Sequence, residues 1–182
     1  MPSEGETPTY QIQDGEKITS AMAYTDSHLI WGEVVTKEVV RVSTWLRTPA
    51  IPLFIFFHNA HVITFSGPTP KPQSFTELHV PSSQVLAFHV KPPAQDPLDY
   101  DPNEPMRKME PTTALVGHFR FDGYLRMSTH TDIERYLDVS KETFTTMYDV
   151  EISQPAFPTM RAIHVLFVLV RSERVLFSRR TA

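Results

Sequence analysis

The chain has 182 residues, of which 41% are hydrophobic, and a formal net charge of −4. This length and apolar content are enough for a buried core in one larger domain or in two small ones. The negative charge and a pI near 6.0 give no general attraction to nucleic acid or anionic lipid, so a polyanionic partner is disfavoured. The absence of cysteine excludes disulfides and thiolate chemistry and fits a reducing cytosol.

Targeting and membrane signals are not found. The N-terminal sequence is acidic and lacks the basic and apolar regions of an export signal. The longest apolar runs, residues 52–57 and 165–170, are far shorter than the roughly 18 to 20 residues that span a bilayer. We therefore expect a soluble, cytoplasmic protein with no membrane span.

Charge is distributed unevenly along the chain. Residues 1–40 hold seven acidic residues against two lysines, and residues 161–182 hold five arginines against one glutamate. The two ends could pair within one molecule or make a head-to-tail contact between molecules. We favour the intramolecular pairing.

The second half of the chain resembles the first at a nearly constant spacing. Gly32 and Gly123 both lie between apolar neighbours, and 123 minus 32 gives an offset of 91, which also aligns Trp45 with Tyr136. After a shift to an offset of 90, residues 59–62 align with 149–152 and residues 80–86 with 170–176. A near-constant offset over separate blocks predicts an internal duplication.

The predicted elements follow one order in both halves. Residues 1–20 form a polar tail, 21–90 the first β-rich repeat, 91–111 a Pro- and Asp-rich linker and 112–182 the second repeat. In the first repeat we expect a strand over 23–35 with a bulge at Gly32, a helix over 39–47, and strands over 53–64, 75–80 and 84–90. In the second we expect a strand over 113–127, a helix over 131–137 capped by Thr131, and strands over 144–153, 161–170 and 174–177.

These elements predict a mainly β fold made of two tandem pseudo-symmetric repeats, each with one short helix. The repeats would form SH3-like or Sm-like partly open barrels, or one shared sheet. The apolar-x-Gly-x-apolar pattern, residues 41–46 and the Asn59-Ala60-x-Val62 pattern together resemble a family of uncharacterised bacterial domains in which such a unit recurs. The second copy departs from the pattern at Asp132 and Glu134. The resemblance implies the fold unit and no activity.

Two acid or imidazole clusters could hold a metal ion, but their contexts argue against it. His58 and His61 are three apart on a predicted strand, where they face opposite sides. The series beginning at Asp99 has the oxygen-ligand spacing of a calcium loop, yet Glu104 stands where glycine is required. We expect no metal and no cofactor.

Catalytic motifs are also missing, because the chain has no nucleophile elbow, no phosphate-binding loop and no dinucleotide fingerprint. A small enzyme could use only dispersed residues near one strand–helix junction, namely His118, Asp122, His130 and Asp132. An RNA or single-stranded DNA site could use the aromatic and basic residues of 119–126. The alternation of apolar and charged residues over 119–126 instead favours a strand with one face in the core and one face in solvent.

The leading hypothesis is a non-enzymatic protein–protein interaction or assembly subunit, which binds a protein partner or another copy through its sheet edges or faces. Residues 53–57 and 165–170 are apolar at consecutive positions, so these strands need cover on both faces. The cover could be the other repeat or a partner. Our candidates for exposed partner-binding anchors are Trp31, Phe57 and Phe88. Nucleic-acid binding and a small enzyme remain the alternatives.

Overall fold

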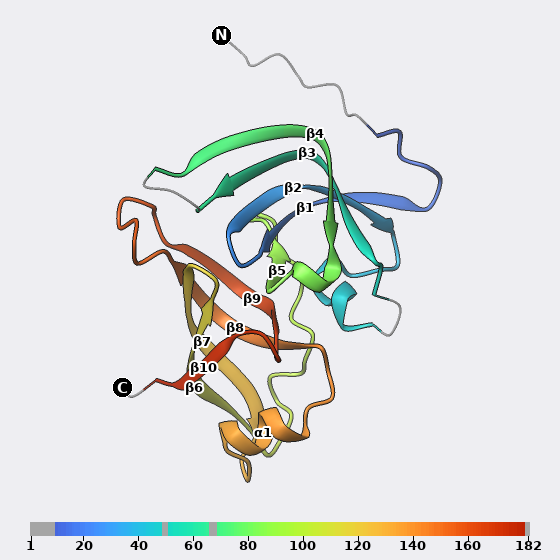
Figure 1. Ribbon diagram of the computed structural model, residues 1–182. Coiled ribbons are helices and arrows are strands. Elements are labelled where there is room, and N and C mark those ends of the chain that lie inside the picture. Colours follow the sequence, from blue (N-terminus) through green and yellow to red (C-terminus); the bar gives the residue numbers. More distant parts are fainter. Residues whose placement is uncertain (1–9, 49–50, 66–68, 181–182) are drawn as a thin grey trace.

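The structure, a computed structural model, describes residues 10–48, 51–65 and 69–180 (Figure 1). Within these ranges the chain forms one open, antiparallel sheet of ten strands in the order β10-β6-β7-β8-β9-β5-β1-β2-β3-β4. Figure 1 shows that the N-terminal half forms the upper lobe and the C-terminal half the lower lobe. The mainly β class is therefore as predicted, and of the two arrangements considered the structure has the single shared sheet.

The elements of the two halves follow each other in matching order. The first half contains β1 (Glu16–Tyr24), β2 (His28–Lys37), the 3-10 helix η1 (Val42–Arg47), β3 (Phe54–Thr64), β4 (Lys71–Pro81), the 3-10 turn η2 (Ser82–Gln84) and β5 (Ala87–Val90). The second half contains β6 (Arg107–Val116), β7 (Phe119–Ser128), the helix α1 (Ile133–Val139), β8 (Phe144–Ser153), β9 (Ile163–Arg171) and β10 (Leu176–Arg179). In both halves the last strand pairs with the first.

Strand pairing has the same register in both halves. Glu16 pairs with Lys37 and Arg107 with Ser128, so both residues of the pair move by 91 positions. Both β2–β3 and β7–β8 also contain one register shift, which follows Trp31 in the first half and Asp122 in the second. The halves join where β5 pairs with β9, at the centre of the sheet.

The core is continuous across this junction. One buried cluster joins Tyr24 and Leu86 of the first half to Phe121 and Leu125 of the second. The other cluster lies mainly in the first half but includes Phe144 of β8. Because each cluster draws on both halves, the two lobes bury apolar surface against each other, which compensates for the small size of each.

The predicted strands over 23–35 and 113–127 were wrong in extent. Each predicted range spans the turn of a hairpin and covers the end of its first strand and most of its second strand. The turns lie at residues 25–27 and 117–118, where the short Asp26-Ser27 and Gly117-His118 sequences reverse the chain. β1 therefore begins inside the predicted polar tail, and β6 begins inside the predicted linker. The predicted cap of the second helix was also wrong, because Asp132, not Thr131, accepts a hydrogen bond from the Arg135 amide.

The two long apolar runs are covered differently. On β9, residues 165 and 167–170 are all buried, so both faces of the strand are covered inside the chain. On β3, Ile55 and Phe57 are fully buried, whereas Phe54 and Phe56 are 44% and 50% exposed. The expected cover of the second face of β3 is therefore not supplied by the described part of the chain. The turn that the Ser66-Gly67-Pro68 sequence indicates after this strand lies outside the described residues.

No helix in the described ranges is both long and apolar enough to cross a membrane.

Candidate functional site: two clefts at equivalent positions

Each half carries a cleft at the same place on its sheet. The clefts have volumes of about 430 Å³ in the first half and about 420 Å³ in the second. In the first, the Tyr10 ring lies 5.0 Å from the His58 ring; in the second, the Tyr100 ring lies 4.9 Å from the Tyr148 ring. Both residues differ by 90 positions between the halves, so the two clefts occupy equivalent places. We call them the aromatic cleft and the basic cleft.

The aromatic cleft is lined by residues of the first half alone: Tyr10, Glu16, Val35, Trp45, Pro52, Phe54, Phe56, Phe57, His58, Glu77 and His79. The basic cleft is lined by Arg47, Asp99, Tyr100, Arg107, Arg126, Tyr136, Val139, Ser140, Lys141, Glu142, Thr146 and Tyr148. At equivalent positions, therefore, Glu16 is replaced by Arg107, Val35 by Arg126 and Trp45 by Tyr136. The basic cleft thus has four cationic side chains, whereas the aromatic cleft has no lysine or arginine.

The basic cleft receives a side chain from the other half. Arg47, the last residue of η1, donates through Nη1 to Asp99 Oδ2 at 2.7 Å and to the Thr146 hydroxyl at 3.1 Å. Its Nε lies 3.3 Å from a carboxylate oxygen of Glu142. These carboxylates raise the pKa of Arg47 against the effect of desolvation, so the guanidinium stays charged.

Tyr148 shares the Asp99 carboxylate with Arg47. Its hydroxyl donates to Asp99 Oδ1 at 2.8 Å, so Asp99 holds both Tyr148 and Arg47. Burial and the adjacent Asp99 carboxylate raise the pKa of Tyr148, which keeps the phenol protonated. The linker residue Asp99 thus joins the two halves through charge-assisted hydrogen bonds.

Two further cations of the basic cleft, Arg126 and Arg107, also have partners in the chain. The guanidinium of Arg126 lies 4.4 Å from the centre of the Tyr100 ring and donates to Glu104 at 2.7 Å. Arg107 donates to the same carboxylate at 3.0 Å. The two arginines lower the pKa of Glu104 by hydrogen bonding. An anionic ligand would have to compete with these carboxylates, which disfavours a phosphate-binding role.

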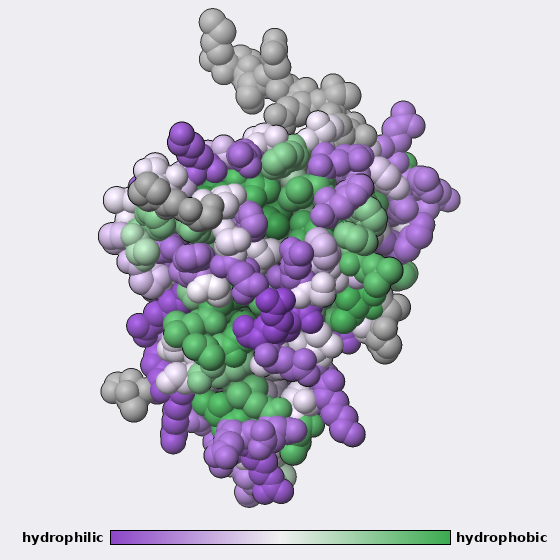
Figure 2. All heavy atoms as spheres, viewed as in Figure 1, coloured by the Kyte–Doolittle hydropathy of each residue, from purple (hydrophilic) through white to green (hydrophobic). Residues whose placement is uncertain are grey.

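The aromatic cleft differs because apolar rings line it and remain accessible. Phe56 packs edge-on against His79 with ring centres 4.7 Å apart, and both lie on the exposed face of the β3–β4 hairpin. Nδ1 of His58 is buried without a hydrogen-bond partner, at 3.6 Å from a Glu77 carboxylate oxygen. The cleft therefore combines exposed aromatic surface with a nearby carboxylate. Figure 2 shows hydrophobic surface on this upper lobe among polar side chains.

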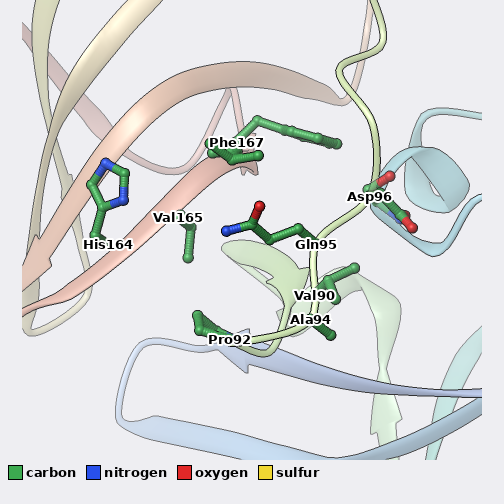
Figure 3. Close-up of a pocket in the computed structure, with 10 residues that line it drawn as sticks. Val90, Pro92, Ala94, Gln95, Asp96, His164, Val165 and Phe167 are labelled. Atoms are coloured by element: carbon green, nitrogen blue, oxygen red, sulfur yellow. The ribbon is translucent and has the colours of Figure 1, made fainter.

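A third hollow lies at the junction of the linker, β9 and η1, and is too small for a ligand. Its volume is about 20 Å³, enough for a single water molecule. Figure 3 shows Gln95 extending from the linker toward Val165 of β9, while Asp96 lies beside η1. The Asp96 carboxylate accepts a hydrogen bond from the Ser43 amide at 3.2 Å. This hollow marks how the linker is attached to both halves.

The structure places the three predicted anchors in different environments. Phe57 and Phe88 have no exposed surface, so the expectation that they are exposed anchors was wrong. They face the core because alternation along β3 puts Phe54 and Phe56 outside, and because β5 lies at the centre of the sheet. Trp31 is partly exposed and stacks on His61 at 5.3 Å. Its role in partner binding stays a prediction.

The dispersed enzyme site considered from the sequence is not assembled. His118 precedes β7 and His130 follows it, so a ten-residue strand, about 33 Å long when extended, lies between the two residues. Asp122 accepts hydrogen bonds from Thr113 and Arg120, and Asp132 caps α1. These residues hold strands and a helix in place and do not converge on a common point.

The other sequence clusters have structural partners as well. His58 and His61 are separated by a bulge, and His61 contacts the Ser74 hydroxyl at 2.9 Å. Of the calcium-like series, Asp99 binds Arg47 and Glu110 binds Lys108 and Arg179. The described residues contain no group of three or more potential ligands that could hold a metal ion.

The two phenylalanines of β7 lie on the buried face, opposite its arginines. Phe119 and Phe121 are buried as alternation predicted, whereas Arg120 is exposed and pairs with Asp122 at 2.8 Å. Stacked bases would need these rings on the surface beside the cations. The arrangement gives no support to a nucleic-acid site on this strand.

Sequence reasoning missed Phe54, Phe56 and the Arg47–Asp99 pair. The alternation of Phe54 and Phe56 with Ile55 and Phe57 was a usable signal, as was the 90-residue spacing of Tyr10 and Tyr100. Arg47 and Asp99 carried no such signal, because 52 residues separate them. In comparisons with protein families, curated proteins and solved structures, nothing matches this chain.

Proposed function

We propose that this protein is a non-enzymatic protein–protein interaction subunit. The observation that carries the proposal is the placement of exposed apolar side chains. Of the twelve large hydrophobic residues exposed in the described ranges, eight belong to the two ends of the sheet. At one end they are Leu53, Phe54, Phe56 and Phe75, and at the other Met106, Met109, Leu115 and Leu176. Apolar surface gathered at open sheet edges is typical of interaction sites.

The aromatic cleft is the proposed partner-binding site. In the equivalent basic cleft, Arg47 of the neighbouring lobe inserts beside Tyr148 and is held by Asp99 and Glu142. The aromatic cleft offers rings in the same place and a carboxylate at Glu77. Accessible aromatic faces attract both apolar side chains and cations. We therefore infer that a partner presents an apolar segment with a basic residue to this cleft.

Internal duplication is the second part of the proposal. It is supported by the common strand order, the common register and the equivalent bulges of the two halves. Each half has the five-strand order found when the last strand returns to the first, as SH3-like and Sm-like units do, although the sheet as a whole is open. On this view the two clefts began as one site. One now holds the lobes together, and the other serves a partner.

The test is capture of binding partners by the tagged chain and by two matched variants. Phe56→Ser removes an exposed ring of the aromatic cleft, and Phe75→Ser removes a ring of similar exposure, 40%, on the adjacent strand outside it. Both changes lie at the surface and should leave folding largely intact. We expect nuclease-resistant capture that Phe56→Ser abolishes and Phe75→Ser retains.

A second readout uses Trp45, which lines the same cleft and is one of only two tryptophans in the chain. Binding in the cleft should shift its fluorescence in a Trp31→Phe background. Capture that is lost with nuclease, or that is equally unaffected by both phenylalanine changes, would contradict a protein-binding role for the aromatic cleft.

A further inference from the structure

We propose that the partner is a second copy of this chain, whose β10 pairs with the free edge of β4. This inference rests on the proposed interaction function and specifies its partner. The contact would repeat, between molecules, the β5–β9 junction that already joins the two halves within one molecule. The two halves have matching strand registers, so each junction residue has an equivalent at an outer edge of the sheet.

The internal junction consists of a short strand pairing and a covering helix. Ala87 pairs with Val170, Phe88 pairs with Leu169, and the Arg171 amide donates to the Leu86 carbonyl at 2.7 Å. Above this pairing, η1 packs its apolar residues on β8 and β9. Val42, Leu46, Phe144 and Leu169 belong to one buried cluster, and each is at most 1% exposed.

The equivalents of these buried residues are exposed or only partly buried at the two ends of the sheet, and one of them, His79 in place of Leu169, is polar. Phe144 corresponds to Phe54, which is 44% exposed, and Ala87 corresponds to Leu176, which is 70% exposed. Val42 and Leu46 correspond to Ile133 and Leu137 of α1, a helix in which no residue is fully buried. One copy therefore presents an apolar helix stripe and strand, and the next copy presents the apolar surface that would accept them.

The register of the proposed contact follows from the equivalences. β5 and β10 pair with the first strands of their halves, β1 and β6, and equivalent residues of β5 and β10 differ by 89 positions. β4 and β9 pair with β3 and β8, and equivalent residues of β4 and β9 differ by 90 positions. Leu176 is then placed opposite Val80, and Arg179 opposite Glu77. Both charged side chains are exposed, at 76% and 55%, and Arg179 Nε also lies 2.8 Å from Glu110 of its own chain, so the contact would share this guanidinium between two carboxylates. A cross-strand pair of opposite charges favours this register over shifted ones.

The contact between copies lacks two features of the internal junction. Arg47, which Asp99 and Glu142 hold in the basic cleft, corresponds to the acidic Asp138 of α1, so these ion pairs are not repeated. Arg171 donates from its guanidinium to the carbonyls of Val85 and Ser82, and its equivalent on β4 is Pro81. The contact is therefore weaker than the internal one and reversible with concentration. Because it joins two different edges of the chain, it is heterologous, so it produces a ring if the rotation closes and an open chain if it does not.

Disulfide trapping tests this register directly, since the chain contains no cysteine. Leu86 and Arg171 form a hydrogen-bonded pair, so alternation puts Leu78 and Ser178 at a non-hydrogen-bonded position, where opposing side chains are closest. Leu78→Cys/Ser178→Cys should give ladders of covalently linked chains under mild oxidation. Thr76→Cys/Ser178→Cys, which is displaced by two residues on the same face, should give at least fivefold less.

Charge reversal provides an independent measurement on surface residues. We expect the native mass to rise with protein concentration, the rise to be lost in Glu77→Arg and in Arg179→Glu, and to be restored by the double reversal. A mass that stays monomeric at all concentrations, or equal trapping of both cysteine pairs, would overturn the self-pairing proposal. If self-pairing fails but capture of a different protein still requires Phe56, the proposed interaction function remains supported. If neither self-association nor Phe56-dependent capture is found, both proposals are refuted.

Discussion

Asn59 and Asp149 lie 90 positions apart and share a left-handed backbone, with φ values of 47° and 49°. Each is the extra residue of a bulge that brings its strand against a glycine of the preceding strand. A Cβ at Gly32 would lie 2.8 Å from the His58 carbonyl oxygen, and one at Gly123 would lie 2.8 Å from the Tyr148 carbonyl oxygen. The glycines are therefore required by a close approach of two backbones.

Replacement of either glycine by alanine should destabilise the protein by a similar amount. The added methyl group meets backbone, which cannot move aside as a side chain could, so we expect a loss of about 2 kcal/mol for Gly32→Ala and for Gly123→Ala. Urea unfolding measures this loss. Gly15→Ala is the control, because its Cβ would meet nothing within 4 Å and only its positive φ opposes the change. An effect no greater than that of the control would show that the close approach is not required.

Much of the sheet could be predicted from the sequence, because alternation and the 91-residue offset report which residues share a face. β8 lies over the predicted residues 144–153, and β3 differs from its prediction by one residue. The hairpin turns at 25–27 and 117–118 were missed. They join strands of the same polarity pattern with only two or three residues between them, so a single longer strand fitted the pattern equally well.

The candidate site was less predictable, since its geometry depends on contacts between distant segments. Phe56 and Phe57 belong to one apolar run, so the sequence did not indicate which of the two rings is exposed. Which face of β3 packs on the core decides that Phe57 is buried and Phe56 exposed. The insertion of Arg47 into the basic cleft depends on the joining of the lobes at β5 and β9. No local pattern encodes that pairing.

Asp132→Ala should weaken the N-terminus of α1. Its carboxylate accepts a hydrogen bond from the Arg135 amide at 2.8 Å, and loss of an N-cap of this kind costs about 1 kcal/mol. The change in the free energy of unfolding, measured in urea, checks the expectation. Thr131→Ala, one residue earlier, should have an effect below about 0.5 kcal/mol. The reverse order of the two effects would restore Thr131 as the cap.

His89 should make the protein lose stability as the pH falls from about 6.5 to about 4. Burial lowers the pKa of its imidazole from 6.5 to about 4, and the ring donates through Nδ1 to the Val90 carbonyl while Nε2 accepts from the Tyr24 hydroxyl. The unfolded chain therefore binds a proton that the folded chain refuses in this interval. The stability is complete above pH 6.5, and about 3 kcal/mol is lost by pH 4.

The measurement is the free energy of unfolding at several pH values between 7 and 4. His89→Asn keeps a donor but does not titrate, so it should flatten the slope even though its stability at pH 7 is lower. His130→Asn, at an exposed turn, should leave the slope as in the parent chain. Equal slopes for all three proteins would show that the pKa of His89 is the same in the folded and the unfolded chain.

Arg47→Met should loosen the attachment of the two lobes. The change removes the donor to Asp99, a carboxylate with only 11% of its side chain exposed, and leaves that charge with the Tyr148 hydroxyl as its remaining partner among the contacts described above. Since Arg47 is itself partly exposed, we expect a loss of about 1 to 2 kcal/mol rather than the larger cost of a fully buried pair. Lys37→Met, which breaks an exposed pair with Glu16, should cost less than about 0.5 kcal/mol.

A double-mutant cycle with Asp99→Asn separates the pair from its surroundings. If the two side chains stabilise the junction through each other, the losses of the single variants should not add, and the coupling should be about 1 kcal/mol. Additive losses would mean that Glu142 and Thr146 hold Arg47 without Asp99. Asp99 would then contribute to the basic cleft through its hydrogen bond with Tyr148 and not through its ion pair with Arg47.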